Sequence, residues 1–268
     1  MFKKKAPKVG LGIIVGIITV LIAGIFVDPY SAYGSSSLVT TPPSATHIFG
    51  TDFLGRDLYS EIVAGAYPSL FVSTVAALGS VILGLFAGVA AGYYSKLHAV
   101  VGGLSDLIMI FPMLPLLIVF GSLFPPSDLF IASLLTMVMW PLVARAIRAQ
   151  VRSVKKLPYV DAARTSGLKD RHIVFTIIVP EVVSIAVAYF IINISFALVL
   201  TTALEFLGVG NPDVVTWGSI LYWAQQFGFL AGAWWWVLIP GAFITITAIA
   251  LAMIGYSLEE IFNPRLRS

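Results

Sequence analysis

The sequence contains no cysteine and few charged residues, and both shortages narrow the class of protein. Without cysteine, disulfide bonds and thiol catalysis are excluded. Only 11% of the 268 residues are charged, against roughly 25% in soluble domains, so too few groups remain to solvate an exterior. Hydrophobic residues make up 59% of the chain. A soluble enzyme, a disordered chain and a nucleic-acid-binding protein are therefore poor fits.

Two catalytic signatures are also missing. No G-x-x-x-x-G-K-[ST] loop occurs and no Gly-Lys pair exists, so the chain lacks that means of binding ATP phosphates. No H-E-x-x-H motif occurs, and His47, His98 and His172 all lie outside the long apolar runs. We expect all three histidines at the surface. An intramembrane protease is thus the disfavoured enzyme alternative, and we predict that the chain is not an enzyme.

Six apolar runs approach the length of about 20 residues that a helix needs to cross a membrane. They cover residues 9–27, 70–91, 99–121, 129–145, 178–200 and 234–254. The first run exceeds the usual signal-peptide core of about 7–15 residues and has no clear cleavage site, which favours a retained helix over a cleaved signal. We predict an all-α membrane protein with six transmembrane helices. Residues 1–46 hold the first helix and the start of an outer segment, and residues 47–268 hold the main transmembrane domain.

Basic residues set the expected orientation. With the amino terminus inside, 15 of the 16 Lys and Arg residues fall in inner segments, and only Arg56 falls outside. This bias predicts that both termini are cytoplasmic. Most tryptophans then lie on the outer side, where amphipathic rings favour the membrane interface; these are Trp217, Trp223, Trp234, Trp235 and Trp236.

Glycine and proline indicate how the spans pack. Gly84, Gly88 and Gly92 recur every four residues, so they line one helical face and allow another helix to approach closely. Pro112 removes an amide donor from the third span and is expected to bend or loosen it. We favour tight packing within one bundle over a moving pore wall. Asp106, near the inner end of the third span, is expected to make a helix-end contact rather than to relay protons.

The long inner loop after the fourth span contains a short amphipathic segment. Pro158 suits a first helical position and Gly167 suits a stop in left-handed conformation. They bracket a helix at about residues 158–167, which is marginal alone in water and needs a packing partner. A small apolar stripe flanked by charge lies within it, formed by Tyr159, Ala162 and Ala163 with Asp161 and Arg164. We therefore interpret this segment as an element that docks onto a partner.

The stretch DAARTSGLKDRHIVFTIIVP resembles a signature of the membrane subunits of binding-protein-dependent ABC importers: E-A-A, three residues, G, nine residues, I, one residue, L-P. Asp161 stands for the glutamate and Val179 for the leucine, while Gly167, Ile177 and Pro180 match. The resemblance implies that the segment is a coupling helix seated in a groove of an ATP-binding subunit. The implied coupling residues are Tyr159, Asp161, Ala162, Ala163, Arg164, Gly167 and Pro180.

Other segments resemble the C-type permease of dipeptide, oligopeptide and nickel importers. HIFGTDFLGRDLYSEIVAGAYPSL, SDLIMIFP, WPLVAR, FLGVGNPDVVTWGSIL and NPRLR occur in the right order, so the resemblance covers about residues 47–267. It implies the type I importer transmembrane-domain fold. It also suggests a periplasmic entrance that contacts the binding protein, formed by Gly50, Thr51, Asp52, Gly55, Arg56, Asp57, Asn211 and Pro212. The alternative that Asp52, Arg56 and Asp57 are solvated or pair locally stays open.

The same resemblance implies the other components of the importer. The partners would be a homologous B-type permease, two ATP-binding subunits that carry ATP and magnesium, an extracytoplasmic substrate-binding protein and membrane lipid. No cofactor on this chain and no nucleic-acid partner are expected. The cargo would be peptides, with oligosaccharides and nickel complexes as alternatives. A secondary carrier driven by an ion gradient is the other function considered, but it would usually place several ionisable groups near the midplane, and the span centres hold none.

Overall fold

The computed structural model describes residues 6–27, 30–229 and 231–262, and the regular elements in these ranges are helical. The basic residues at positions 3–5 and the NPRLR segment at 263–267 lie outside them. The helices are α1 (Ala6–Val27), α2 (Leu58–Tyr93), α3 (Ser95–Ile110), α4 (Met113–Ser122), α5 (Asp128–Val154), α6 (Pro158–Thr165), α7 (Asp170–Ile173), the π-helix η1 (Val174–Ile178), α8 (Val179–Phe206), α9 (Trp217–Trp223), the π-helix η2 (Ala224–Gly228) and α10 (Trp234–Phe262).

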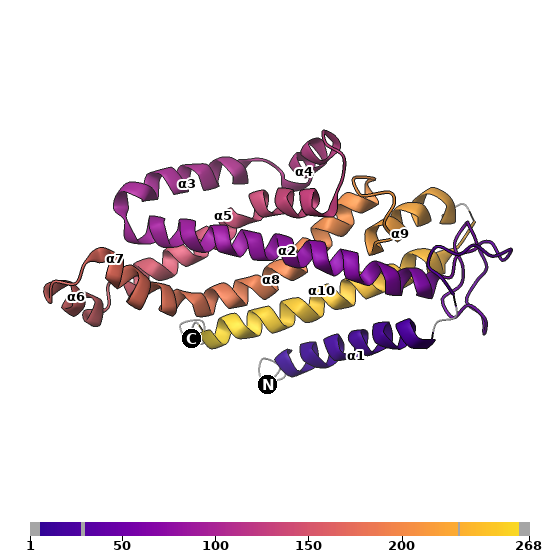
Figure 1. The fold of residues 1–268 in the computed structure, drawn as a ribbon, viewed down its shortest axis with the longest axis horizontal. Coiled ribbons are helices and arrows are strands. Elements are labelled where there is room, and N and C mark those ends of the chain that lie inside the picture. Colours follow the sequence, from indigo (N-terminus) through magenta and orange to yellow (C-terminus); the bar gives the residue numbers. More distant parts are fainter. Residues whose placement is uncertain (1–5, 28–29, 230, 263–268) are drawn as a thin grey trace.

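The long helices form an elongated bundle, with α1 lying along α10 (Figure 1). Within the described ranges, five segments are long and apolar enough to cross a membrane, namely α1, α2, α5, α7 to α8, and α10. If the bent pair α3 and α4 is counted as one span, the number of candidate spans rises to six. Helix α6, the start of α1 and the end of α10 lie toward one end of the bundle, here called the α6 end (Figure 1). Residues 30–57 and α9 lie at the opposite end, the loop end.

The third span is not the continuous helix expected over residues 99–121. Helix α3 ends at Ile110, α4 begins at Met113, and their axes differ by 84°. Phe111 and Pro112 are both extended between them, because a residue before proline avoids the helical region and proline has no amide to donate. Pro112 is also exposed, so the expectation that it contributes to helix packing is wrong for this chain alone.

The glycine stripe of α2 faces α5. A Cβ atom at Gly84 would lie 2.5 Å from Val143 Cβ, and one at Gly88 would lie 2.7 Å from Ile147 Cβ. Gly92 faces Val151 in the same way. Real Cβ atoms do not approach this closely, so the spacing of α2 and α5 depends on these glycines. This is the close approach that the four-residue interval predicts.

A polar contact joins α3 to α5. Arg145 Nη2 donates to Asp106 Oδ1 at 2.9 Å, between positions inside both helices rather than at a helix end. Both side chains are at least half exposed, so the pair adds only about 0–1 kcal/mol to the free energy of unfolding.

Candidate functional site

Helix α6 has sequence-encoded ends. Pro158 occupies its first turn, where the missing amide would have no helical partner. At the other end Gly167 has φ +83°. The Leu168 amide donates to the Ala163 carbonyl at 3.2 Å and the Gly167 amide donates to the Arg164 carbonyl at 3.1 Å. This pair of bonds is a Schellman motif, which stops the helix and satisfies its last carbonyls.

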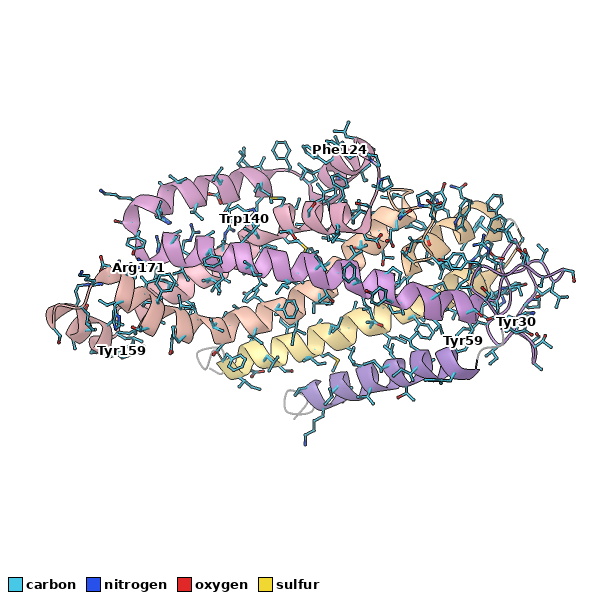
Figure 2. All side chains as sticks on the ribbon, viewed as in Figure 1. Tyr30, Tyr59, Phe124, Trp140, Tyr159 and Arg171 are labelled. Atoms are coloured by element: carbon cyan, nitrogen blue, oxygen red, sulfur yellow. The ribbon has the colours of Figure 1, made fainter. Side chains whose placement is uncertain are left out.

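One residue of α6 is fully buried in the bundle. Val160 is 0% exposed and packs in a cluster with Val154 and Ile173, and Ala163 packs partly against the same cluster. The opposite side, here called the outer face of α6, consists of exposed residues, namely Tyr159, Asp161 and Ala162. Arg164 is also exposed, but it lies one turn after Val160 and so shares its face. Figure 2 shows Tyr159 at the far end of the bundle. A helix held from one side presents its other side to a partner.

The segments flanking α6 are fixed to the end of α2. Tyr93 donates its hydroxyl hydrogen bond to Asp170 Oδ1 at 2.6 Å. Lys155 Nζ donates to the Tyr93 carbonyl at 2.6 Å and lies 4.7 Å from the centre of the Tyr93 ring. Contacts on both sides of α6 therefore reach one residue of α2, so a displacement of α6 would be transmitted to that helix.

The loop end is organised around the GTDFLGRD stretch. Gly50 and Gly55 have φ values of +80° and +74°, which only glycine adopts without strain. Between them Asp52 Oδ1 accepts from the amides of Leu54, at 2.8 Å, and Arg56, at 2.7 Å. Burial raises the pKa of Asp52, and the bonds from these amides oppose the rise. The stretch is thus a closed, internally bonded turn.

Asp57 begins α2 and is paired with a histidine. Its Oδ2 accepts from the Ser60 amide at 2.9 Å, which caps the helix. Its Oδ1 lies 2.8 Å from His47 Nδ1, and His47 is only 3% exposed. The expectation of a surface position is therefore wrong for His47, although it holds for His172. A buried carboxylate needs partners on both oxygens, and His47 supplies the second.

Replacing His47 by alanine is expected to lower the free energy of unfolding by about 1–3 kcal/mol, because Asp57 Oδ1 would be left buried and unpaired. Limited proteolysis should then cut residues 36–57 faster than in the wild type. His172→Ala is the matched control, since His172 is exposed. Equal cleavage rates for the two variants would contradict the structural role given to His47.

The segment after α8 is held by a buried glutamate. Thr216 Oγ1 donates to Glu205 Oε2 at 2.8 Å, and Glu205 is 5% exposed. Asn211 Oδ1 accepts from the Asp213 amide at 3.1 Å, which forms the turn expected at Asn211 and Pro212. Pro212 is exposed. These residues lie at the same end of the bundle as the GTDFLGRD turn.

The sequence profile of binding-protein-dependent transport system inner membrane components matches residues 80–268. The chain belongs to this family. It is therefore a multi-pass permease subunit of the plasma membrane, and the expected type I importer membrane fold is confirmed.

Named relatives cover almost the whole permease subunit. The dipeptide transport system permease protein DppC of Alkalihalophilus pseudofirmus is 32% identical over 269 residues, covering 99% of this chain and 88% of the relative. The oligopeptide transport system permease protein OppC of Bacillus subtilis is 27% identical over 273 residues, covering 100% and 89%. A Brucella suis protein named provisionally as a peptide transport system permease is 35% identical over 227 residues, covering 84% and 76%.

The importer signature of this permease subunit spans four structural elements. Asp161 to Gly167 form α6 and its stop, residues 168–178 form α7 and η1, and Pro180 lies exposed in the first turn of α8. The π-helix η1 is closed by the Val179 amide, which donates to the Val174 carbonyl. Sequence reasoning missed η1, because five residues of π-helix leave no readable periodicity.

At the loop end, most of the predicted entrance residues build the turn rather than project from it. Gly50, Thr51, Asp52, Gly55 and Asp57 are all buried. Arg56 is partly exposed, with its Nη1 3.6 Å from Glu61 Oε1 and its Nε 3.9 Å from Asp52 Oδ2. These contacts agree with the alternative of local pairing. Contact between this end of the permease subunit and a binding protein stays a prediction.

The tryptophans differ from the expected interface belt. Trp217, Trp235 and Trp236 are buried in the hydrophobic cluster of the loop end, whereas Trp223 and Trp234 are exposed. Trp217 Nε1 donates to the Ile62 carbonyl at 2.9 Å, which satisfies it inside the core. Large aromatic surface stabilises most when it is buried. Of the five tryptophans expected at the interface, three belong instead to the core.

Proposed function

We propose that this permease subunit forms half of the translocation path of an ATP-driven peptide importer and is moved by separate ATP-binding subunits through α6. The observation that carries the proposal is α6 itself, an eight-residue helix on the importer signature that buries Val160 and exposes its outer face. The peptide cargo rests on the names of the dipeptide and oligopeptide relatives.

The proposed orientation puts the α6 end, and with it both termini, in the cytoplasm. Among the described lysines and arginines, Arg56 alone lies at the loop end. Arg171, labelled in Figure 2, lies with Tyr159 at the α6 end. Basic residues favour the cytoplasmic side of a membrane protein. The loop end then faces the extracytoplasmic substrate-binding protein.

The proposed partners are a homologous B-type permease and two ATP-binding subunits, on which ATP and magnesium would be held. A cavity of about 650 Å³ opens on the side of α5, α8 and α10. Its lining is mostly apolar and includes Leu142, Asn193, Phe196 and Tyr256. A second permease facing this cavity would close it into a path. ATP can drive alternation of that path only if it binds one global state more tightly than the other.

The stop of α6 provides the test. Gly167→Val forces a β-branched residue to adopt φ +83°, which costs about 1–2 kcal/mol. Because nothing lies within 4 Å of an added Cβ atom, the effect comes from the backbone conformation and not from a clash. We expect substrate-stimulated ATPase activity and peptide uptake to fall roughly five- to tenfold in the complete reconstituted importer.

Gly167→Asn is the matched control, because asparagine tolerates the left-handed conformation. It should keep transport within about twofold of wild type. Wild-type activity in Gly167→Val would contradict the role of α6. Recovery of a homo-oligomer that moves substrate on an ion gradient without ATP-binding subunits would instead support the carrier alternative.

A further inference from the structure

A small polar cavity lies at the loop end, where the GTDFLGRD turn meets α9 and the start of α10. Its volume is about 200 Å³. Arg56 and Glu61 line one side, Asp213 and Val215 another, and Trp223 and Trp236 complete it. One bound water needs only about 10–15 Å³ of such space, so the cavity can admit a larger polar group.

Three buried polar atoms that belong to residues lining this cavity have no hydrogen-bond partner. They are Arg56 Nε, Glu61 Oε2 and Trp236 Nε1. Glu61 is 4% exposed and Trp236 is 1% exposed. In the part of the chain that the structure describes, Thr201 Oγ1 is the fourth such side-chain atom, and Thr201 does not line this cavity. Unpartnered buried polar atoms are rare because each costs about 1–3 kcal/mol. Three that belong to residues lining one cavity indicate a binding site there.

The charges around the cavity favour a cation. Arg56 lies between Asp52 and Glu61, and Asp57 also acts electrostatically on Glu61. The Arg56 guanidinium therefore pairs with two carboxyl groups, those of Asp52 and Glu61, whereas Asp57 is bonded to His47. Asp213 adds a fourth carboxyl to the lining. No group of three or more metal-ligating side chains is found in the described ranges, so an organic ammonium ion fits the site better than a metal ion.

We propose that this cavity binds the amino-terminal residue of a peptide. The ammonium group would donate to Glu61 Oε2, and the first carbonyl oxygen would accept from Arg56 Nε and Trp236 Nε1. A small side chain would lie against Val215. The faces of Trp223 and Trp236 also attract a cation. The cavity would thus hold a peptide briefly as it leaves the binding protein, a role that rests on the proposed function.

The test uses the complete importer in lipid nanodiscs without its binding protein, so that the binding measured is that of the membrane complex. The probes are alanylalanine and N-acetyl-alanylalanine, measured by titration calorimetry. The wild type should bind alanylalanine at least tenfold more tightly, because acetylation removes the ammonium charge. This comparison needs no variant and therefore does not depend on how a substitution folds.

Glu61→Gln keeps the shape of the side chain and replaces the carboxyl group by an amide that cannot ionise beside an ammonium group, and it should weaken alanylalanine binding at least tenfold. Trp236→Phe, which lacks the indole donor, should weaken it several-fold. Glu205→Gln is the control, since Glu205 is equally buried at the same end but its Oε2 already accepts from Thr216. It should leave peptide binding within about twofold of wild type.

Equal binding of the two peptides by the wild type, or unchanged binding in Glu61→Gln, would overturn the proposal. So would a result in which alanylalanine does not bind and Glu61→Gln weakens docking of the binding protein, because the occupant would then be a side chain of that protein. Failure of the proposed function is distinct: it would appear as absence of ATP-dependent peptide uptake by the wild-type importer with its binding protein present.

Discussion

Replacing Gly88 by valine is expected to destabilise the permease subunit more than any other substitution considered. A Cβ atom at Gly88 would lie 2.7 Å from Ile147 Cβ and 2.8 Å from the Ala144 carbonyl oxygen. One of these atoms belongs to the backbone of α5, so a change of rotamer cannot relieve the contact and the two helices must separate. The expected loss is about 3 kcal/mol, the upper part of the range for overpacked cores.

The measurement is the thermal unfolding midpoint in detergent, together with the yield of monodisperse protein. Gly16→Val is the matched control, because Gly16 also lies within a helix but has nothing within 4 Å of an added Cβ atom. The two variants share the same change in helix propensity, so their difference reports packing alone. Gly16→Val should stay within about 0.5 kcal/mol of wild type. Equal midpoints for the two variants would show that α2 and α5 do not depend on the glycine stripe.

The second large effect is expected at Val160. Val160→Asp places a carboxylate where the side chain is 0% exposed, among Val154, Ile173 and other apolar residues. A buried unpaired charge is so costly that α6 should leave the bundle instead. An isolated eight-residue helix is unstable in water. The amides of residues 160–166 should then lose hydrogen-exchange protection, and peptide uptake should fall at least about tenfold.

Val160→Ile is the control, because it keeps an apolar, β-branched side chain and changes only volume. It should retain protected amides, and the added methylene should cost about 1–3 kcal/mol. Hydrogen exchange can be followed in the permease subunit without its proposed partners, so it separates detachment of α6 from loss of coupling. Protected amides in Val160→Asp would show that Val160 is not the anchor. Lost protection with normal uptake would show that α6 does not transmit force.

The two ends of the molecule are joined by continuous helices. Helix α8 begins beside η1 at the α6 end and reaches Glu205, which holds Thr216 at the loop end. Helix α2 runs from Leu58, next to its cap Asp57, to Tyr93, and Tyr93 contacts Lys155 and Asp170. Because helices move as stiff units, a displacement at α6 is expected to reach the polar cavity as a rigid-body motion rather than as a local rearrangement. Such a motion would connect the two proposed functions mechanically.

The sequence alone determined the features that are local or periodic. The apolar runs predict the spans because hydrocarbon thickness fixes their length, although α2 extends twelve residues before the predicted start at residue 70. Pro158 and Gly167 predict α6 because each acts on its own backbone. The interval of Gly84, Gly88 and Gly92 predicts one helical face. A short ordered motif was enough to recognise the family.

Only the tertiary structure decided the features that depend on distant residues. Whether Pro112 bends a helix or breaks it depends on the space that the surrounding helices leave, and here it separates two helices by 84°. The sequence predicts a surface position for His47, but in the folded chain its Nδ1 lies 2.8 Å from Asp57 Oδ1. The polar cavity combines Arg56 and Glu61 with Trp236, which are far apart in the chain. Composition and periodicity predict the secondary structure of each segment and the face that it buries. Burial and hydrogen-bond partners depend instead on which segments meet in space.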